Sequence, residues 1–552
     1  MRKRILWIGG SIIAFLILVM IILSIFISNF VESEARAYLK KHPPKGYILD
    51  FEKISVRPWS RTIKVKNITF ISNLDSLPGV KPGNEPLNVH IESIKIAGVN
   101  LFRGLKSKNY KVSKIEVINP RGRILTSGSV FNAKHTVERS HKAGIDSTRK
   151  NPFNTLEAGD ILVLDAELAI IDSITQQKLL TASNVFFDFK GVYMDSSLSM
   201  FRAADIHVDI RDNEVVLPGD LYKVKYNRLR VTKLDSTISI DSLQLIPLYE
   251  KYKFAREVGK QTDRFTFGMD SLNIYGVNFD SLLMIQEPIL RLIEVNGLHA
   301  SIFRDKHRPF DFSNYPKLPH EALRTMDKDI TVEEVRINNG YVEYIEHEAG
   351  AENPGKVFFE EINGSILNIT SDSLRILEHP AMEINATMML FGKGKLEAYI
   401  QMPLNDPKDN FTFKGHLTEM QMKEVNHFLS PSAMVDVNSG QIDDLSFTAS
   451  ANRYVGKGSM NFLYNSLTID VLKEKDGKIK RRWFISTIAT SFVKNENPSP
   501  NKPVRVAPMY FDRDMNKGII NFLWKTIFSG IKETLLPSKQ KDNNQGKSKK
   551  EK

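Results

Sequence analysis

Few residues in this sequence have the types and the spacing that enzyme chemistry requires. Asp512 and Asp514 flank Arg513 in the segment YFDRDMNKG, and two carboxylates so placed could act as an acid–base pair or hold a metal ion. However, the segment directly precedes a stretch with helical periodicity, where acids at this spacing usually form turns and helix caps. We therefore expect a structural role for these residues.

A second candidate site contains His135, Glu138 and His141 in a long polar stretch. Metal-binding histidines usually lie closer together and on ordered elements, so this spacing favours a solvated loop. The motifs GxSxG and HExxH and a Gly-rich phosphate loop are missing from the sequence. The chain also has no cysteine, which excludes disulfides and thiolate ligands. We expect no enzyme activity, no metal and no cofactor; a hydrolase would need a cleft of convergent polar residues.

The elements that would have to position any site are mostly strands. In EINATMML (383–390) and KLEAYIQM (395–402), apolar and polar residues alternate with a period of two, which is typical of half-buried antiparallel strands. Strand–helix–strand alternation is missing, so a parallel α/β sheet is not expected. The predicted fold is mainly β: an elongated, antiparallel, repeating β-groove, open and curled, with a few short helices, an N-terminal transmembrane helix and a C-terminal amphipathic helix.

The sequence repeats itself. IESIKIAGVNLFRGL (91–105) and MDSLNIYGVNFDSLL (269–283) belong to a gapless match of residues 87–125 with 265–303, in which 10 of 39 positions are identical. Such drift between copies indicates one structural unit used twice. The shared Gly-Val-Asn predicts a turn or bulge between strands, at Gly98 and Asn100 in one copy and Gly276 and Asn278 in the other.

One segment predicts a membrane anchor. Residues 5–28 form an uncharged, mostly aliphatic run that would measure about 36 Å as a helix, enough to cross a bilayer. The run is longer than the apolar core of a signal peptide, which favours an uncleaved anchor. Cations at residues 2–4 and acids after the run place residues 1–4 in the cytoplasm and the body outside, which in a Gram-negative cell is the periplasm.

The net charge of +12 does not indicate a nucleic-acid partner. Residues 2–4 contribute +3 and the tail 538–552 contributes +4, with six lysines against two acids, so only +5 remains for the rest of the chain. A phosphate-tracking surface needs a basic stripe interleaved with aromatic residues. The body of the sequence contains no such stripe.

The rest of the chain divides by composition. We expect a juxtamembrane helix at 29–44, a repetitive β-groove region at 45–310 with a long polar loop at 126–154, a second β region at 311–517, and a disordered basic tail at 538–552. The segment 518–537 predicts an amphipathic helix that is either a lid docked on the sheet or a helix lying in a membrane surface. Its apolar positions are Ile520, Leu523, Trp524, Ile527, Phe528, Ile531 and Leu535.

Many alternating strands with few helices to cover them leave an apolar face without a partner. A sheet that grows by repetition and curls into a trough would expose this face unless something apolar fills it. We expect acyl chains to lie along it. The candidate lining residues are Val89, Ile91, Ile384, Met388, Leu396, Ile400, Phe411, Phe413, Phe447, Met460 and Phe462.

Three segments carry a resemblance to a known family. They are the strand pair FEKISVRPWSRTIKVKNITF (51–70) behind the anchor, the run SGQIDDLSFTASANRYVGKGSMNFLYNSLTIDVL (439–472), and NFLWKTIFSGIKETL (521–535). Together they resemble the AsmA-like proteins of Gram-negative envelopes, a group that includes TamB and is similar to the chorein-type bridge-like lipid transfer proteins. The chain is much shorter than TamB, and a module for docking on an outer-membrane barrel is not recognisable.

The resemblance implies an inner-membrane protein with a periplasmic β-groove, linked to phospholipid movement between inner and outer membrane and to outer-membrane integrity. Its expected partners are a phospholipid or other acyl-chain lipid, the inner membrane, and a periplasmic or outer-membrane protein. The resemblance supplies no catalytic residues. The alternative function is a structural or assembly factor for outer-membrane proteins, with a closed core and no lipid groove.

Overall fold

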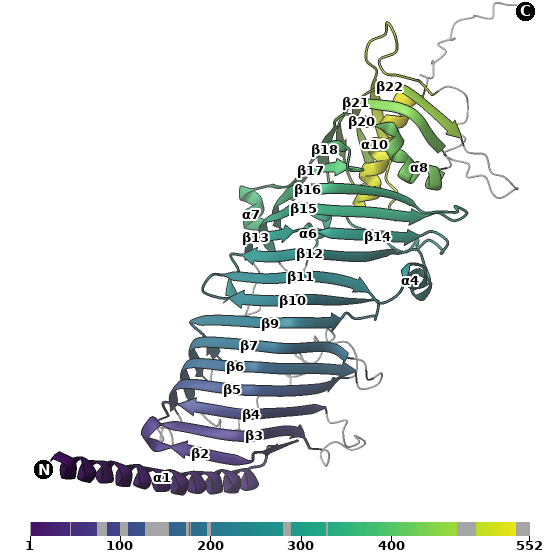
Figure 1. Ribbon diagram of the computed structural model, residues 1–552. Helices are drawn as coiled ribbons and strands as arrows, with labels where there is room; N and C mark the ends of the chain where they lie inside the picture. Colours follow the sequence, from purple (N-terminus) through teal and green to yellow (C-terminus); the bar gives the residue numbers. More distant parts are fainter. Residues whose placement is uncertain are drawn as a thin grey trace, which may run out of the picture. The chain divides into compact units, whose positions relative to one another are not determined.

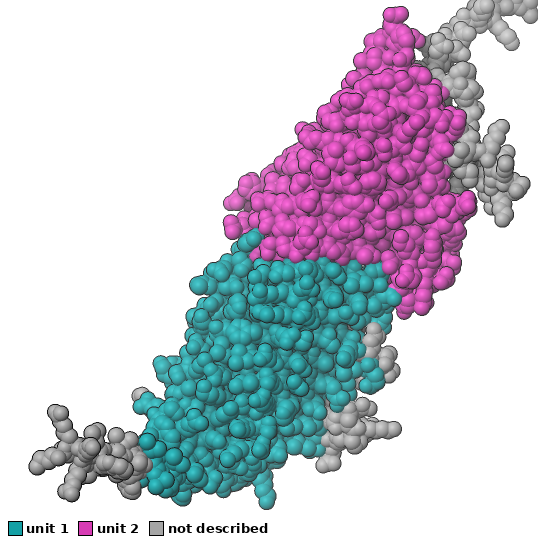
Figure 2. All heavy atoms as spheres, in the orientation of Figure 1, with its two compact units in different colours: residues 1–248, 275–279 teal, residues 249–274, 280–552 magenta. Residues whose placement is uncertain are grey.

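A computed structural model describes most of the chain (Figure 1). The described residues are 2–44, 46–73, 86–99, 109–126, 154–172, 176, 178–195, 200–279, 289–326, 329–433, 435–471 and 493–536. The predicted loop at 126–154 and the tail at 538–552 therefore fall almost entirely outside them. The chain divides into two compact units, residues 1–248 with 275–279 and residues 249–274 with 280–552 (Figure 2).

The first unit is a ladder of long strands preceded by one long helix. The helix α1 spans Arg2–Lys41 and ends just before Pro43 and Pro44, as the restriction on residues preceding proline requires. A short 3-10 turn, η1 (Pro58–Ser60), separates β2 from β3. The strands are β1 (Tyr47–Asp50), β2 (Lys53–Arg57), β3 (Thr62–Ser72), β4 (Leu87–Ala97), β5 (Asn109–Thr126), β6 (Thr155–Asp172), β7 (Lys178–Asp195), β8 (Met200–Arg202), β9 (Asp205–Val216), β10 (Tyr222–Thr232) and β11 (Thr237–Pro247).

Neighbours in this ladder follow chain order. β1 and β2 both pair with β3, which pairs with β4, and the series continues through β5, β6, β7, β9 and β10 to β11, with the short β8 beside the end of β7. Every pair is antiparallel except β5 and β6, which are parallel. The predicted mainly β fold is thus confirmed, with a parallel pair that the strand periodicity does not predict.

The second unit continues the same strand type. Its strands are β12 (Asp263–Tyr275), β13 (Ile289–Asn296), β14 (His299–Asp305), β15 (Thr331–His347), β16 (Gly355–Thr370), β17 (Ala381–Leu390), β18 (Gly394–Pro403), β19 (Phe411–Leu417), β20 (Met420–Gln421), β21 (Val435–Ala451), β22 (Val455–Val471) and β23 (Val506–Asp512). Its short helices are α4 (Lys251–Val258), α6 (Pro319–Arg324), α7 (Ser373–Glu378), η4 (Met422–Val425) and α8 (Asn426–Ala433), and α10 (Ile519–Leu535) is longer.

A closed core fills the C-terminal part of the second unit. β15 to β19 and then β21 to β23 pair antiparallel in order, while α8 packs on β16 and β21 and α10 packs on β22 and β23. The alternation that predicts half-buried strands supplies the inner residues. The core joins 23 buried apolar side chains, among them Met402, Phe411, Met460 and Phe522.

The two copies of the sequence repeat have the same local geometry. In the first, β4 pairs antiparallel with β5, with Leu87 opposite Ile124, and in the second, β12 pairs antiparallel with β14, with Phe265 opposite Ile302. These pairs are separated by the 178 residues of the sequence match. In each copy the next strand is parallel: β6 to β5, and β15 to both β13 and β14. The repeat therefore encodes a hairpin followed by a parallel strand.

The glycines of the repeat end equivalent strands in the left-handed region, with φ of 74° at Gly98 and 71° at Gly276. The next N–H donates in each case to the carbonyl before the preceding strand: Val99 to Arg61 and Val277 to Ser236. The predicted role of Gly98 and Gly276 in a turn thus has a physical basis, because only glycine adopts this φ without strain. Asn278 is exposed beside buried Val277, and Asn100 lies outside the described residues.

Candidate functional site

Two adjacent rows of apolar side chains cross the strands of the first unit, and together we call them the apolar stripe. Cross-strand register gives the first row as Val56, Ile63, Ile96, Ile115, Ile161, Phe189 and Ile206. It gives the second row as Ile54, Val65, Ile94, Val117, Val163, Phe187, Val208, Val231 and Ile238. The second row reaches from β2 to β11 without a polar member.

Most of the stripe is only half buried. Of its members, Ile54, Val56 and Ile206 are buried, and the others keep part of their surface exposed. In the described part of the first unit α1 is the only α-helix, and buried apolar residues form clusters of just five and four. The C-terminal core of the second unit holds 23 such residues. The first unit therefore presents an apolar surface that its own packing leaves partly open.

The helix α1 covers the first end of the stripe. Ile27, Val31, Ala35 and Leu39 pack on the cluster of Phe51, Ile54, Val56 and Ile68. Arg36 fixes the same end, because its Nη2 donates 2.9 Å hydrogen bonds to the carbonyls of Phe51 and Glu52. Further toward the N-terminus, Ile22 and Phe26 are exposed, and the described part of the helix is long and apolar enough to cross a membrane. The stripe thus begins where α1, the candidate membrane helix, packs on the sheet.

A line of backbone irregularities runs beside the stripe and was not predicted. Asn67, Asn119, Asp165, Asn184, Asp212 and Ser242 all have φ between 46° and 55°, in six strands of the first unit. At this level the pairings of β3 with β4 and of β4 with β5 skip one residue on each strand. The pairings of β6 with β7 and of β7 with β9 shift register, as in β-bulges, which bend and twist strands. Asn and Asp tolerate this conformation better than other non-glycine residues.

The sequence does contain a signal for this line. Val65 and Ile68 belong to one apolar cluster although they are three residues apart on β3, and Ile91 and Ile94 do the same on β4. In a regular strand, residues three apart point to opposite faces. A change of phase in the apolar alternation, with Asn in the interval on β3, therefore marks the irregularity.

The predicted lining residues divide into two groups. Val89, Ile91, Ile384, Met388, Leu396 and Ile400 are half buried. Their register fits a common face in each unit, since Ile384 lies opposite Ile400 and Met388 opposite Leu396. Phe411, Phe413, Phe447, Met460 and Phe462 are instead buried inside the closed core, where they pack against one another. These five have a packing role in this structure and offer no open face to a ligand.

The C-terminal helix α10 packs on the core through a face that the apolar periodicity of its sequence does not predict. Its buried residues are Phe522, Thr526, Gly530 and Thr534, at a spacing of four. Gly530 lies against Met460 and Met509, and Thr526 against Gly456, so small side chains allow close contact. The predicted apolar positions flank this contact: Leu523, Ile527, Ile531 and Leu535 pack at the edge of the core, and Phe528 is half buried. Ile520 and Trp524 are exposed.

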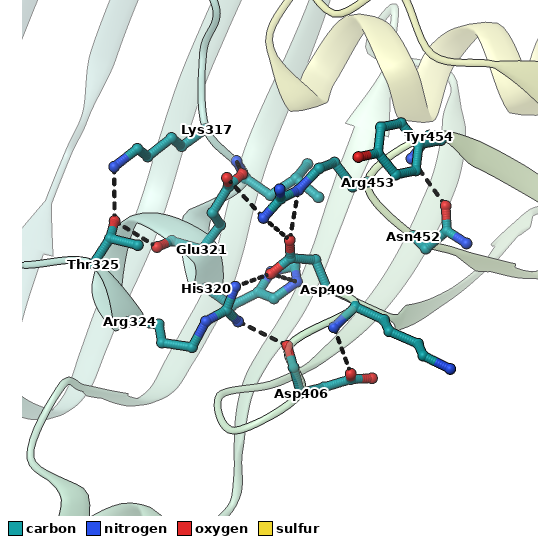
Figure 3. Close-up of polar contacts among 12 residues, drawn as sticks. Lys317, His320, Glu321, Arg324, Thr325, Asp406, Asp409, Asn452, Arg453 and Tyr454 are labelled. Atoms are coloured by element: carbon teal, nitrogen blue, oxygen red, sulfur yellow. Dashed lines mark hydrogen bonds and ion pairs between the residues drawn. The ribbon is translucent and has the colours of Figure 1, made fainter.

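Figure 3 shows a cluster of charged side chains in the second unit, which we call the Asp409 clamp: His320, Glu321, Arg324, Asp409 and Arg453. Asp409 is fully buried and accepts hydrogen bonds from Arg324 Nη2 at 2.6 Å and from Arg453 Nη2 at 2.6 Å. Arg453 Nη2 also lies 3.0 Å from Glu321 Oε1. The clamp joins α6 to the loop before β19 and to the turn between β21 and β22.

The environment of the clamp favours a structural role. His320 is fully buried, and its Nε2 lies 3.9 Å from Asp409 Oδ1, beyond hydrogen-bond distance. Burial lowers the pKa of His320, so this imidazole is neutral near pH 7. The hydrogen bond that Arg453 donates to Asp409 raises the pKa of Arg453. The carboxylate is enclosed and saturated by arginines, which leaves it unable to act on a substrate.

The acidic pair around Arg513, first considered for chemistry, has structural contacts. Arg513 is buried and donates to the carbonyl of Pro316 at 2.5 Å, while Asp514 accepts from the backbone of Asn516 in a turn. His135, Glu138 and His141 lie outside the described residues. Within the described ranges, groups of three or more side chains that could hold a metal ion do not occur. No protein-family model matches this sequence, and none of the curated proteins compared with it matches either.

Proposed function

We propose that this protein is a membrane-anchored lipid-handling protein that binds acyl chains along the apolar stripe. The observation that carries the proposal is the stripe itself: an apolar row from β2 to β11, half exposed, that starts beneath the candidate membrane helix. A row with a polar or charged break would not serve an acyl chain. The AsmA-like resemblance of the sequence points to the same class of function.

The dimensions and energetics of the stripe suit this role. Nine strands at a spacing of about 4.8 Å give a row of about 38 Å. Each methylene group kept out of water contributes about 0.8 kcal/mol, so a chain lying on the row would be held by many small and equivalent contacts. An acyl chain that moves along such a surface never has to dissociate from one strong site. Lipid transfer requires a low barrier of this kind.

The proposed location follows from the charges around the helix. Cations precede the apolar run and Glu32 and Glu34 follow it, so the positive-inside rule places the strand-rich body outside the cytoplasm. In a Gram-negative cell we place the anchor in the inner membrane and the body in the periplasm. The function would then be phospholipid movement toward the outer membrane, in support of its integrity.

Two neighbouring substitutions on β6 test the proposal. Val163 belongs to the stripe, whereas Leu162 lies in the adjacent row between Glu116 and Asp188, on the other face of the strand. We expect Val163→Asn, in the full-length protein, to lose most of the lipid that co-purifies with the wild type. Leu162→Asn should retain it. Lipid is measured by mass spectrometry after extraction, at equal protein concentration.

The result that contradicts the proposal is equal lipid in both variants and the wild type, with both variants folded by circular dichroism. The closed core of the second unit supports a second candidate, a scaffold for envelope proteins, because a closed core leaves no interior surface for a ligand. That candidate predicts that neither substitution changes lipid content, and that surface changes in the second unit alter the set of proteins recovered by crosslinking.

A further inference from the structure

A cavity of about 460 Å³ lies on strands β4 to β7 of the first unit, away from the apolar stripe. Its lining is mixed: apart from small and apolar residues it contains Arg121, Arg123, Lys178 and His90 beside a single carboxylate, Glu167. Several lining residues are small: Gly122 has no side chain, and Ala169 and Ala182 have only a methyl group. The cavity therefore combines small residues with charged and polar side chains.

The strand register explains why these side chains converge. Arg121 on β5 lies between His90 on β4 and Glu167 on β6. Two residues along, Arg123 lies between Asn88 and Ala169. Residues two apart share a face of a strand, so both rows project to the same side. The intermediate row of Val89, Gly122, Leu168 and Ala182 has the opposite phase, although its last three members also border the cavity.

The charges of the lining do not cancel. Arg121 and Lys178 against Glu167 leave a formal charge of +1 with histidine neutral, without counting Arg123, which has a further interaction of its own. The pair of Arg121 and Glu167 is long, at 3.7 Å, and both side chains are more than half exposed, so it neutralises little. Lys178 forms no ion pair with any side chain in the described ranges. A concave surface with this balance attracts anions.

We propose that this cavity binds a phosphate-bearing anion. Guanidinium groups pair with two phosphate oxygens at once, and an ammonium group adds a point charge. The amide of Asn88 and the hydroxyl of Ser183 supply neutral donors at the same rim. The ligand class is a phosphate mono- or diester, either a free small molecule or the headgroup of a lipid. The proposal does not depend on lipid binding by the apolar stripe, which lies elsewhere.

The test is a titration of the full-length protein in an uncharged detergent with inorganic phosphate and with glycerol 3-phosphate, followed by calorimetry. We expect saturable binding of glycerol 3-phosphate. The double variant Arg121→Gln, Lys178→Gln should bind at least ten-fold more weakly, and Glu167→Gln should bind at least three-fold more tightly because it removes the opposing charge. Lys111→Gln is the matched control: it lies on the same strand outside the cavity and pairs with Glu157.

The gain in affinity of Glu167→Gln keeps the test decisive even if the double variant does not fold. Absence of saturable binding, or an equal loss in Lys111→Gln and the double variant, would overturn the proposal. A third titration uses dihexanoyl phosphatidylglycerol below its micellar concentration. Tighter binding than glycerol 3-phosphate, abolished in the double variant, supports a lipid headgroup as the ligand; equal affinity supports a free phosphate ester.

Discussion

Ser28 on α1 binds the edge strand β2 at Val56: its Oγ accepts a 2.8 Å hydrogen bond from the Val56 N–H. Ser24, one turn earlier, donates to the Val56 carbonyl at 2.5 Å. Both polar groups of a buried strand residue are thus satisfied by side chains of the helix. An exposed strand edge invites pairing with other chains, so these two serines close the edge at the point where α1 packs on the sheet.

Replacing Ser28 with alanine should weaken this junction. The buried N–H of Val56 would lose its acceptor, at a cost of about 1–3 kcal/mol. Hydrogen exchange of the full-length protein in detergent should show faster exchange in residues 53–57. Ser60→Ala, at an exposed serine after β2, is the control and should leave that rate unchanged. Unchanged exchange in both variants would mean that the hydrogen bond does not hold the edge.

Asp409 should be the most sensitive residue of the clamp. Asp409→Asn leaves Arg324 and Arg453 without their shared carboxylate, and breaking a buried ion pair by removing one partner costs about 3–5 kcal/mol. Thermal unfolding should show a lower midpoint for the second unit. Asp443→Asn, at an exposed carboxylate that accepts from Asn465, should cause a much smaller change. Similar midpoints for the two variants would contradict the role of the clamp.

The stability of the second unit should depend on pH through His320. Burial lowers the pKa of His320 in the folded protein below its value of about 6.5 in the unfolded chain. The unfolded state therefore takes up the proton first as the pH falls. Stability contributed by the neutral imidazole is complete above about pH 6.5 and is lost as the pH falls from there through the folded pKa.

Denaturant unfolding at pH 7.5 and pH 5 measures this effect. The wild type should lose more stability at pH 5 than His320→Phe, which carries no proton in either state and keeps a ring beside Phe411, whose centroid is 5.7 Å from that of His320. His427→Phe, at an exposed histidine of α8, is the comparison. Equal pH dependence in the wild type and His320→Phe would exclude His320 as the titrating group.

Most of the fold class could be predicted because apolar alternation is a local signal. EINATMML and KLEAYIQM form β17 and β18, with Ile384 opposite Ile400. The Gly-Val-Asn repeat marks equivalent turns because a positive φ restricts which residue can occupy the position. Both features depend only on residues close together in the chain, which a single sequence displays.

The closed core and the clamp could not be predicted in the same way. Alternation shows that Phe411 and Met460 share a face with their strand neighbours, but not that α10 covers this face. Glu321, Asp409 and Arg453 come together from three distant segments. Their spacing in the sequence has no period, so only the folded chain brings them into contact.

Glycine at position 98 should be required for close approach as well as for its φ. An ideal Cβ there would lie 2.3 Å from Ser113 Oγ, whereas at Gly350, with φ of 88°, a Cβ would meet nothing within 4 Å. Gly350→Ala should therefore cost only the conformational term, about 1 kcal/mol. Gly98→Ala should cost clearly more, measured by denaturant unfolding. Equal costs would show that the approach of β4 to Ser113 relaxes easily.

The small residues of α10 should decide how tightly the helix closes the core. A Cβ on Gly530 would lie 2.7 Å from Met509 Cγ and 3.1 Å from Met460 Cβ. Gly530→Val therefore adds volume where the helix and the core already touch. It should destabilise the second unit by about 1–3 kcal/mol or displace the helix. Trp524→Val, on the exposed side of the same helix, adds no volume to the core and should cost less than 1 kcal/mol by the usual range for surface changes.

Limited proteolysis distinguishes the two results of overpacking. If α10 is displaced in Gly530→Val, cleavage between β23 and the end of the helix should become faster while the folded strands stay resistant. If the helix stays in place under strain, cleavage should stay slow while the unfolding midpoint falls below that of Trp524→Val. A match with Trp524→Val in both measurements would contradict a seating role for the close contact with Met460 and Met509. Displacement of α10 would also bear on the two proposed functions, because it would expose Phe411, Met460 and Phe522. If the Gly530→Val variant then bound more lipid than the wild type, the core of the second unit, once opened, would be able to bind lipid as we propose for the apolar stripe.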